Sequence, residues 1–319
     1  MNEAPASSKQ LWLRIARWAM AVIVTVFLVR AVADASASFD REQFSLSRIQ
    51  FSWLVAAGVA YLLGLLPMGL YWHYMLHVLG QRPGLGQTLR AYYVSHLGKY
   101  VPGKAMVVLL RMGLLRGGRF DSTLVAVSVF AETLTMMAVG AFLAAGMLAA
   151  RLADHRGLLL LACGLMVVAG LPTVPPVFRR LIRGLRVHHA SPQAAQALDR
   201  ITLRVIAIGW LCNAIGWLLL AFSLWAVLRA LPLAEPLAGF PQLMPRLVAS
   251  VSLAVVAGFL SLLPGGLGVR EWVLNELMIE PFGRVVAVSS AVLLRLVWLL
   301  SELLVSIILY MTVRSARQP

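Results

Sequence analysis

Charged residues are scarce in this chain: Asp, Glu, Lys and Arg make up 13% of its 319 residues, whereas 60% are hydrophobic. A soluble domain carries roughly a quarter charged residues, so this composition excludes one. The chain also lacks a long polar stretch, and its apolar runs approach the ~20 residues that cross a hydrocarbon core. We therefore expect an all-α, polytopic membrane protein with one membrane domain over residues 1–319.

Cysteine is almost absent as well. Cys163 and Cys212 are the two cysteines, and both lie in apolar runs, which excludes a disulfide framework and a cysteine metal site. His73 and His77 stand one helical turn apart, a spacing that can bind a metal, but no convincing third ligand accompanies them. We expect neither a metal nor a cofactor.

Acidic residues are the minority among the charges, with 13 Asp and Glu against 28 Lys and Arg. The positive charges cluster in short loops, which indicates membrane orientation first, affinity for anionic lipid second, and no nucleic-acid partner. The most basic loop, residues 178–204, is therefore predicted to be cytoplasmic. Counting spans outward from it places both termini in the cytoplasm, in a multi-pass protein of the cytoplasmic (inner) membrane. That loop contains Arg179, Arg180, Arg183, Arg186, Arg200 and Arg204.

Six apolar stretches are long enough to be predicted as full transmembrane helices. The first is preceded by basic residues and followed by small ones, so a cleaved signal peptide is an alternative to a membrane anchor there. The six stretches are Trp18–Ala33, Phe51–Leu79, Ser122–Ala150, Gly157–Leu171, Val205–Leu228 and Val286–Val313.

Two further apolar segments are broken by proline and glycine. Leu85–Leu115 is broken at Pro102 and Gly103, and Leu247–Ile279 is broken between Pro264 and Gly268. Each half has about 12–18 residues, which is marginal for a crossing, so a re-entrant helix hairpin is predicted; two thin, tilted spans are the alternative.

The two halves of the chain, residues 1–171 and 205–313, are predicted to form an inverted repeat. By the span count, the first hairpin opens from the cytoplasm and the second from outside. In support, a Val-Ala-Val-Ser motif follows each break at nearly the same separation, as Val125–Ser128 after Pro102 and as Val286–Ser289 after Pro264.

The first break resembles a phosphate-binding P-loop but fails on mechanism. Ala105 replaces the hydroxyl that would hold Mg²⁺, Pro102 removes a backbone amide, and no strand precedes the motif, which excludes ATP binding. Lys99, Lys104 and Arg111 could instead hold a lipid phosphate at the hairpin tip. The alternative is that these side chains extend to the cytoplasmic headgroups.

The second break contains Pro264 and three glycines, and is followed by an ionisable pair, Arg270 and Glu271. Charges inside an apolar segment are costly unless they are paired or face a polar cavity. The pair is therefore either a structural ion pair or part of a headgroup pathway. The glycines predicted at this tip are Gly265, Gly266 and Gly268.

Three more charges interrupt long spans. The separation between Pro102 and Glu132 is nearly equal to that between Pro264 and Arg295, so symmetry suggests that the two charges pair near the midplane. Glu302 follows Arg295 by about two helical turns, on roughly the same helix face. We hypothesise that five charged residues line one buried cavity between the halves: Glu132, Arg270, Glu271, Arg295 and Glu302.

These motifs are similar to those of the lysylphosphatidylglycerol synthase transmembrane-region family. The resemblance is carried by residues 98–104, by Arg111 and Glu132 downstream, and by residues 263–271 with their Pro-Gly-Gly-x-Gly-x-Arg-Glu pattern. It covers most of the chain and implies a flippase-like membrane domain that moves a phospholipid, an aminoacyl-phospholipid or a glycolipid. The soluble aminoacyl-transferase domain of the bifunctional members is not expected here.

The favoured function is therefore ATP-independent movement of a lipid headgroup through a cavity between the hairpins, while the acyl tails stay in the bilayer. The expected partners are anionic or polyprenyl-linked lipids and a lipid-modifying enzyme. Two alternatives stay open: an intramembrane transferase with Glu132 or Glu271 as general base, and a non-catalytic subunit that presents lipids.

Overall fold

The computed structural model describes residues 49–101, 105–115, 120–151, 156–184, 196–233, 236–261 and 263–315. Every regular element in these ranges is a helix. The all-α prediction is confirmed. The predicted span Trp18–Ala33 and the tip residues Pro102, Gly103 and Lys104 lie outside the described residues.

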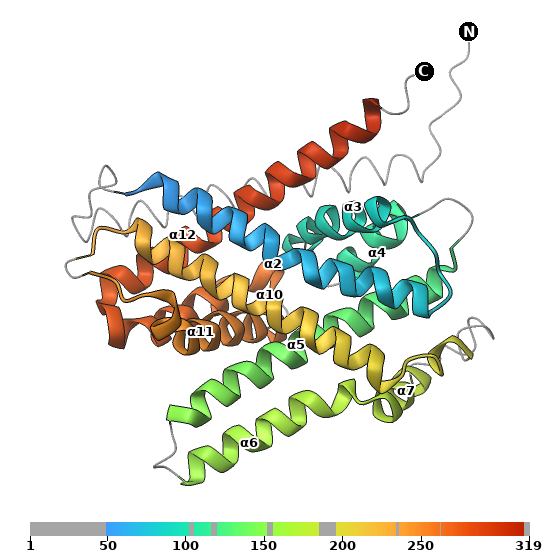
Figure 1. Cartoon of the computed structure of the whole chain (residues 1–319), viewed down its shortest axis with the longest axis horizontal. Coiled ribbons are helices and arrows are strands. Elements are labelled where there is room, and N and C mark those ends of the chain that lie inside the picture. Colours follow the sequence, from blue (N-terminus) through green and yellow to red (C-terminus); the bar gives the residue numbers. More distant parts are fainter. Residues whose placement is uncertain are drawn as a thin grey trace.

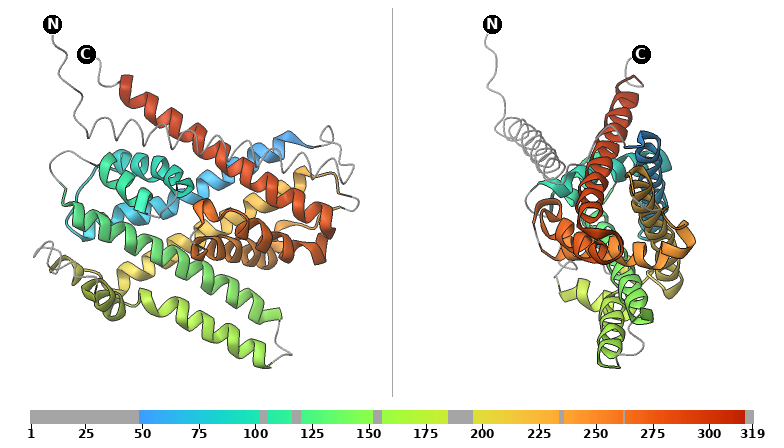
Figure 2. Two further views of the ribbon diagram at one scale, coloured as in Figure 1. Left: turned by 180° about the vertical axis from the view of Figure 1, so that it is seen from behind. Right: turned by 90° about the vertical axis from the view of Figure 1, so that its left-hand side faces the viewer.

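Long helices run side by side and form the body of the molecule (Figures 1 and 2). They are α2 (Phe51–Val78), α5 (Ser122–Arg151), α6 (Arg156–Gly170), α10 (Leu203–Ala230) and part of α12 (Val269–Ser315). Five helices of the described part are long and apolar enough to cross a membrane: α2, α5, α10, α12 and α11 (Phe240–Leu260). The polytopic prediction is therefore confirmed. Helix α6 has 15 residues and is shorter than these five.

Both broken segments form helix–turn–helix hairpins. The first hairpin consists of α3 (Leu85–Ser95), the 3-10 turn η2 (His96–Tyr100) and α4 (Ala105–Leu114). The second consists of α11, the turn η4 (Pro264–Gly266) and the start of α12. Helix α11 has 21 residues, more than was expected of half a hairpin, because its helical stretch begins at Phe240 and includes Pro245.

Helix α12 contains a sharp reversal between the predicted segments Leu247–Ile279 and Val286–Val313. Gly283 adopts φ 78° and ψ 163°, a conformation that only glycine tolerates readily, and it directly follows the Pro281–Phe282 pair. Gly283 divides α12 into a first arm, residues 269–282, and a second arm, residues 284–315. The first arm completes the second hairpin, and the second arm contains the predicted span Val286–Val313.

The hairpins enter the helix bundle from opposite ends. Figures 1 and 2 show α3 and α4 at the end where α2 finishes, and α11 with the first arm of α12 at the other end. Their tips meet in the middle, where η2 contacts η4. A Cβ added at Gly265 would lie 2.9 Å from Cδ1 of Tyr100, so the two tips are in direct contact.

Glycine allows α2 and α10 to pack backbone against backbone. A Cβ at Gly216 would lie 2.8 Å from the carbonyl oxygen of Gly64, and one at Gly64 would lie 3.1 Å from that of Gly216. Small residues are the usual means of close helix packing within a membrane. The hairpins lie against this pair, α3 on α2 and α11 on α10.

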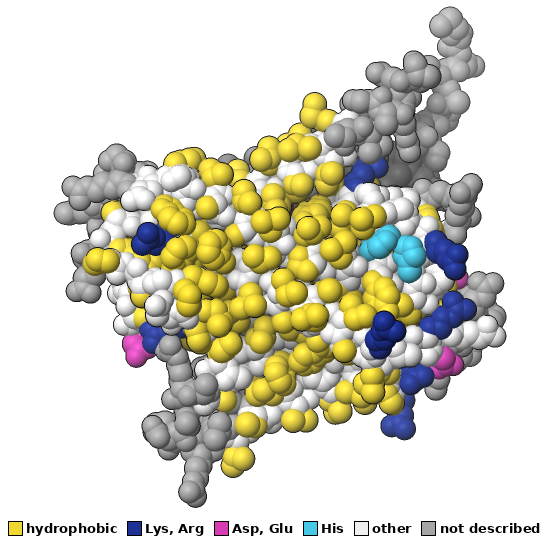
Figure 3. All heavy atoms as spheres, viewed as in Figure 1, with side chains coloured by type: hydrophobic (Ala, Val, Ile, Leu, Met, Phe, Trp, Pro, Cys, Tyr) yellow, Lys and Arg dark blue, Asp and Glu magenta, His cyan; other side chains and the backbone are white. Residues whose placement is uncertain are grey.

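The outer surface fits a lipid environment. Figure 3 shows a broad hydrophobic belt across the helices, and most of the Lys and Arg side chains that it shows gather at the end where α2 finishes and α10 begins. Large apolar side chains such as Val55, Leu211 and Leu203 are more than half exposed. Exposed apolar surface of this extent marks contact with lipid or with another protein.

Candidate functional site

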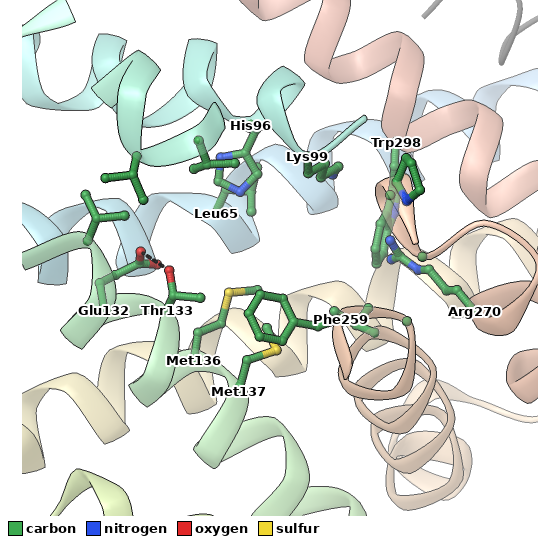
Figure 4. Close-up of a pocket in the computed structure, with 18 of the residues that line it drawn as sticks. Leu65, His96, Lys99, Glu132, Thr133, Met136, Met137, Phe259, Arg270 and Trp298 are labelled. Carbon is green, nitrogen blue, oxygen red and sulfur yellow. Dashed lines mark hydrogen bonds between the residues drawn. The ribbon is translucent and has the colours of Figure 1, made fainter. Parts of the chain in front are cut away.

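A cavity of about 370 Å³ lies where the two hairpin tips meet. Its walls are mainly apolar and come from both hairpins and from α2, α5, α10 and the second arm of α12. In Figure 4, Glu132, Met136 and Met137 project from α5 on one side, with Lys99 and Arg270 across the space. The polar and charged lining residues are Tyr61, His96, Lys99, Arg111, Glu132, Thr133 and Arg270.

Lys99 projects inward from η2, at the tip of the first hairpin. Its Nζ forms an ion pair with Oε1 of Glu302, on the second arm of α12, and lies 3.3 Å from the hydroxyl oxygen of Tyr61. The Tyr61 hydroxyl donates to the same carboxylate oxygen. Glu302 is fully buried, so Lys99 and Tyr61 together stabilise its charge.

Arg111 connects the returning arm of the first hairpin to α5. Its Nη1 lies 2.6 Å from Oε2 of Glu132, and its Nε donates to Oγ of Ser95 at 3.1 Å. The Tyr92 hydroxyl donates to Oε1 of Glu132 at 3.2 Å. The guanidinium also lies over the rings of Tyr92 and Trp72, 4.4 and 4.6 Å from their centroids. Both charged side chains are almost completely buried, and both are well satisfied.

Arg295 and Glu271 form the corresponding pair in the second half of the chain. Arg295 Nη1 pairs with Oε1 of Glu271, and Nη2 donates to the carbonyl oxygen of Gly265 at 3.3 Å. Oε2 of Glu271 accepts a hydrogen bond from the backbone amide of Gly268 at 2.8 Å, which satisfies a free donor at the start of α12. The pair therefore holds the second hairpin tip.

The expected pairing of Glu132 with Arg295 is wrong. Glu132 instead pairs with Arg111, and Arg295 pairs with Glu271. Of the five charges expected to line one cavity, two line the cavity described here. Glu132 and Arg270 line it, but Glu271, Arg295 and Glu302 do not. The charges formed ion pairs with nearer partners because helix packing determines which partner is close.

Arg270 differs from the other cations. Its guanidinium lies over the Trp298 ring, 4.3 Å from the centroid. Trp298 stacks on Tyr61, with centroids 4.4 Å apart, and donates from Nε1 to Oγ of Ser223 at 2.9 Å. Among the described residues, no carboxylate forms an ion pair with Arg270.

Glycines form the tip of the second hairpin, as the sequence predicts. Gly265, Gly266 and Gly268 have φ of 59°, 69° and 77°. A Cβ at Gly266 would lie 2.8 Å from the Cα of Gly258 on α11, whereas one at Gly268 would meet nothing within 4 Å. The backbone of the tip therefore packs against α11 at Gly266.

Sequence reasoning missed the aromatic residues of the site. Tyr61 and Tyr92 contribute hydroxyl donors to the two buried glutamates, and Trp298 supports Arg270. A tyrosine in the middle of an apolar span could have pointed to these residues, because a buried phenolic hydroxyl requires a hydrogen-bond partner. His73 bonds Thr88, and His77 bonds a backbone carbonyl; within the described ranges no cluster of three potential metal ligands occurs.

The family model described as "Lysylphosphatidylglycerol synthase TM region" matches residues 11–306. No curated protein matches the chain.

Proposed function

Because the chain belongs to the lysylphosphatidylglycerol synthase transmembrane-region family, we propose that it is an ATP-independent, flippase-like protein that moves a lipid headgroup across the membrane. Membership identifies a multi-pass membrane protein related to lipid handling. The proposal adds the translocation step, the pathway, and an inner-membrane location with both termini in the cytoplasm.

The observation that carries the proposal is the cavity between the hairpin tips. It combines apolar walls with cationic side chains, Lys99 and Arg270, at the level where the two hairpins meet. A lipid needs such a combination, because its phosphate must be solvated by the protein while its acyl chains stay in an apolar medium. Broken helices at the midplane commonly build sites of this kind in transporters.

The opposed hairpins provide a pathway. The cavity lies between a hairpin from each end of the bundle, so movement of either tip would open it toward one side. Polar contacts hold the tips to the bundle, such as the Arg295–Gly265 hydrogen bond and the Lys99–Glu302 ion pair. Breaking and re-forming such contacts could open and close the cavity, because a hydrogen bond and an ion pair are both local and reversible.

The test is leaflet exchange in liposomes that contain the purified protein and a phospholipid with a fluorescent headgroup. Dithionite bleaches the outer leaflet, so protein-dependent loss of the protected inner-leaflet signal measures movement. Val255→Trp, which places an indole in the cavity wall on α11, is expected to reduce exchange to the rate of protein-free liposomes. Leu260→Trp, on the same helix at a position that is 70% exposed, is the matched control and should retain activity.

Two other outcomes of this experiment would favour one of the alternative functions. A covalently altered lipid in the mass spectrum would replace the proposal by an intramembrane transferase. Neither exchange nor chemistry, with a lipid co-purifying, would indicate a subunit that presents lipid to a partner enzyme.

A further inference from the structure

The charges around the cavity do not balance. Among the described residues, those that line it, or that pair with each other beside it, include four cations and three carboxylates. Three ion pairs account for six of them, which leaves one positive charge. The cations are Lys99, Arg111, Arg270 and Arg295; the carboxylates are Glu132, Glu271 and Glu302.

The excess charge belongs to Arg270. Its guanidinium is turned toward Trp298 and the cavity, and it lines the cavity directly (Figure 4). A guanidinium stacked on an indole keeps its N–H donors in its own plane, available for a planar, two-oxygen acceptor. A phosphate presents two such oxygens.

The carboxylates, by contrast, are engaged. Glu132 is the one carboxylate among the lining residues, and it is held by Arg111, Tyr92 and Thr133. Glu302 and Glu271 lie behind the lining in their own ion pairs. A headgroup ammonium that entered the cavity would thus meet Lys99 and Arg270 and no free carboxylate.

From this imbalance we propose that the cavity selects lipids whose headgroup carries a net negative charge, and that Arg270 is the residue that sets this preference. The inference rests on the proposed function and assigns the substrate class of the same site. A monoanionic phosphodiester with an uncharged headgroup neutralises Arg270. A zwitterionic headgroup adds a cation that the cavity cannot accept, and a lysylated headgroup adds two.

The test compares three probes that carry the same fluorescent acyl chain: phosphatidylglycerol, phosphatidylcholine and lysyl-phosphatidylglycerol. Leaflet exchange by the wild type is expected to be about tenfold faster for phosphatidylglycerol than for phosphatidylcholine, and slowest for the lysyl ester, because one charge-assisted contact is worth about this factor. Arg270→Met should reduce the ratio to near one. Arg270→Lys keeps the charge and should keep most of the preference.

Binding is measured separately, so that failure of translocation does not hide the answer. In detergent, added phosphatidylglycerol should raise the thermal unfolding midpoint of the wild type more than phosphatidylcholine does, and Arg270→Met should remove that difference. Arg246→Met on α11 removes a positive charge outside the cavity lining and should leave the difference unchanged.

Two results would overturn the inference: equal treatment of the three headgroups by the wild type in both assays, or an unchanged preference in Arg270→Met. Absence of exchange with headgroup-selective binding would instead reject the proposed function and retain the inference. Preference for the lysyl ester would show that the cavity accepts an ammonium, and would overturn the assignment.

Discussion

The two hairpins are joined to their following long helices by ion pairs of opposite polarity. In the first half, the hairpin provides the cation, Arg111, and α5 provides the carboxylate, Glu132. In the second half, the hairpin provides Glu271, and the second arm of α12 provides Arg295. The positions correspond along the chain, since Glu132 and Arg295 follow the prolines of their respective breaks at nearly equal separations. In both halves an ion pair joins the hairpin to the following long helix, but the cation and the carboxylate have swapped positions.

The two ion pairs join corresponding elements, but they differ in how deeply they are buried and in what surrounds them. The side chains of Arg111 and Glu132 are 3% and 2% exposed, and Arg111 also lies over two aromatic rings, whereas the side chains of Arg295 and Glu271 are 9% and 25% exposed. The second pair also bonds the tip itself, through the Gly265 carbonyl and the Gly268 amide. The first pair is therefore the more enclosed of the two, and under the proposed function we expect the second pair to exchange when its tip moves.

The largest effect is expected at the first pair. Glu132→Ala leaves the Arg111 guanidinium buried without its counter-charge, so unfolding in mixed micelles should become easier by about 3–5 kcal/mol. The double variant Arg111→Met/Glu132→Leu removes both charges and should recover most of that loss. SDS titration measures both free energies of unfolding. A double variant as unstable as the single one would show that the pair is not what holds the hairpin.

The next largest effect concerns the tip of the second hairpin. An alanine in the left-handed region costs about 1–2 kcal/mol, and Gly268→Ala should show that cost alone. Gly266→Ala must in addition displace the backbone of α11 at Gly258, so it should cost more than Gly268→Ala. The same titration compares the two variants. Equal losses would mean that the tip does not press against α11.

A smaller loss of stability is expected at the second pair. Glu271→Gln keeps a side chain that can accept the Gly268 amide, and Arg295 keeps its bond to Gly265, so the cost should be about 1–2 kcal/mol. Leaflet exchange per folded protein, however, should fall severalfold, because the tip loses its charged anchor. If Glu271→Gln is instead as destabilising as Glu132→Ala, the proposed difference between the pairs does not exist.

The smallest effect provides the baseline. Arg179 and Asp199 form an ion pair at 3.2 Å at the basic end of the bundle, where their side chains are 28% and 60% exposed. Surface pairs of this kind contribute about 0–1 kcal/mol. Asp199→Asn should therefore change neither the free energy of unfolding nor exchange measurably. A loss comparable to that of Glu271→Gln would show that burial is not what distinguishes the ion pairs of this protein.

The sequence alone determined the fold class and the places where the chain breaks. The long apolar runs require helices, because a backbone in lipid must satisfy its own hydrogen bonds. The glycines after Pro264 predict a tight tip, and all three that were named have positive φ. The reversal at Gly283 falls in the gap that the prediction left between Ile279 and Val286, but the sequence did not single out this glycine.

The partners of the charges were decided by the tertiary structure. Spacing along the chain identified Glu132, Arg295 and Glu302 as unusual, but it suggested the wrong pairing between the first two. A buried charge pairs with the nearest suitable group, and which group is nearest depends on how the helices pack. The aromatic supports and the position of Arg270 over Trp298 follow from the same packing, because they arise only where two hairpins from opposite ends of the bundle meet.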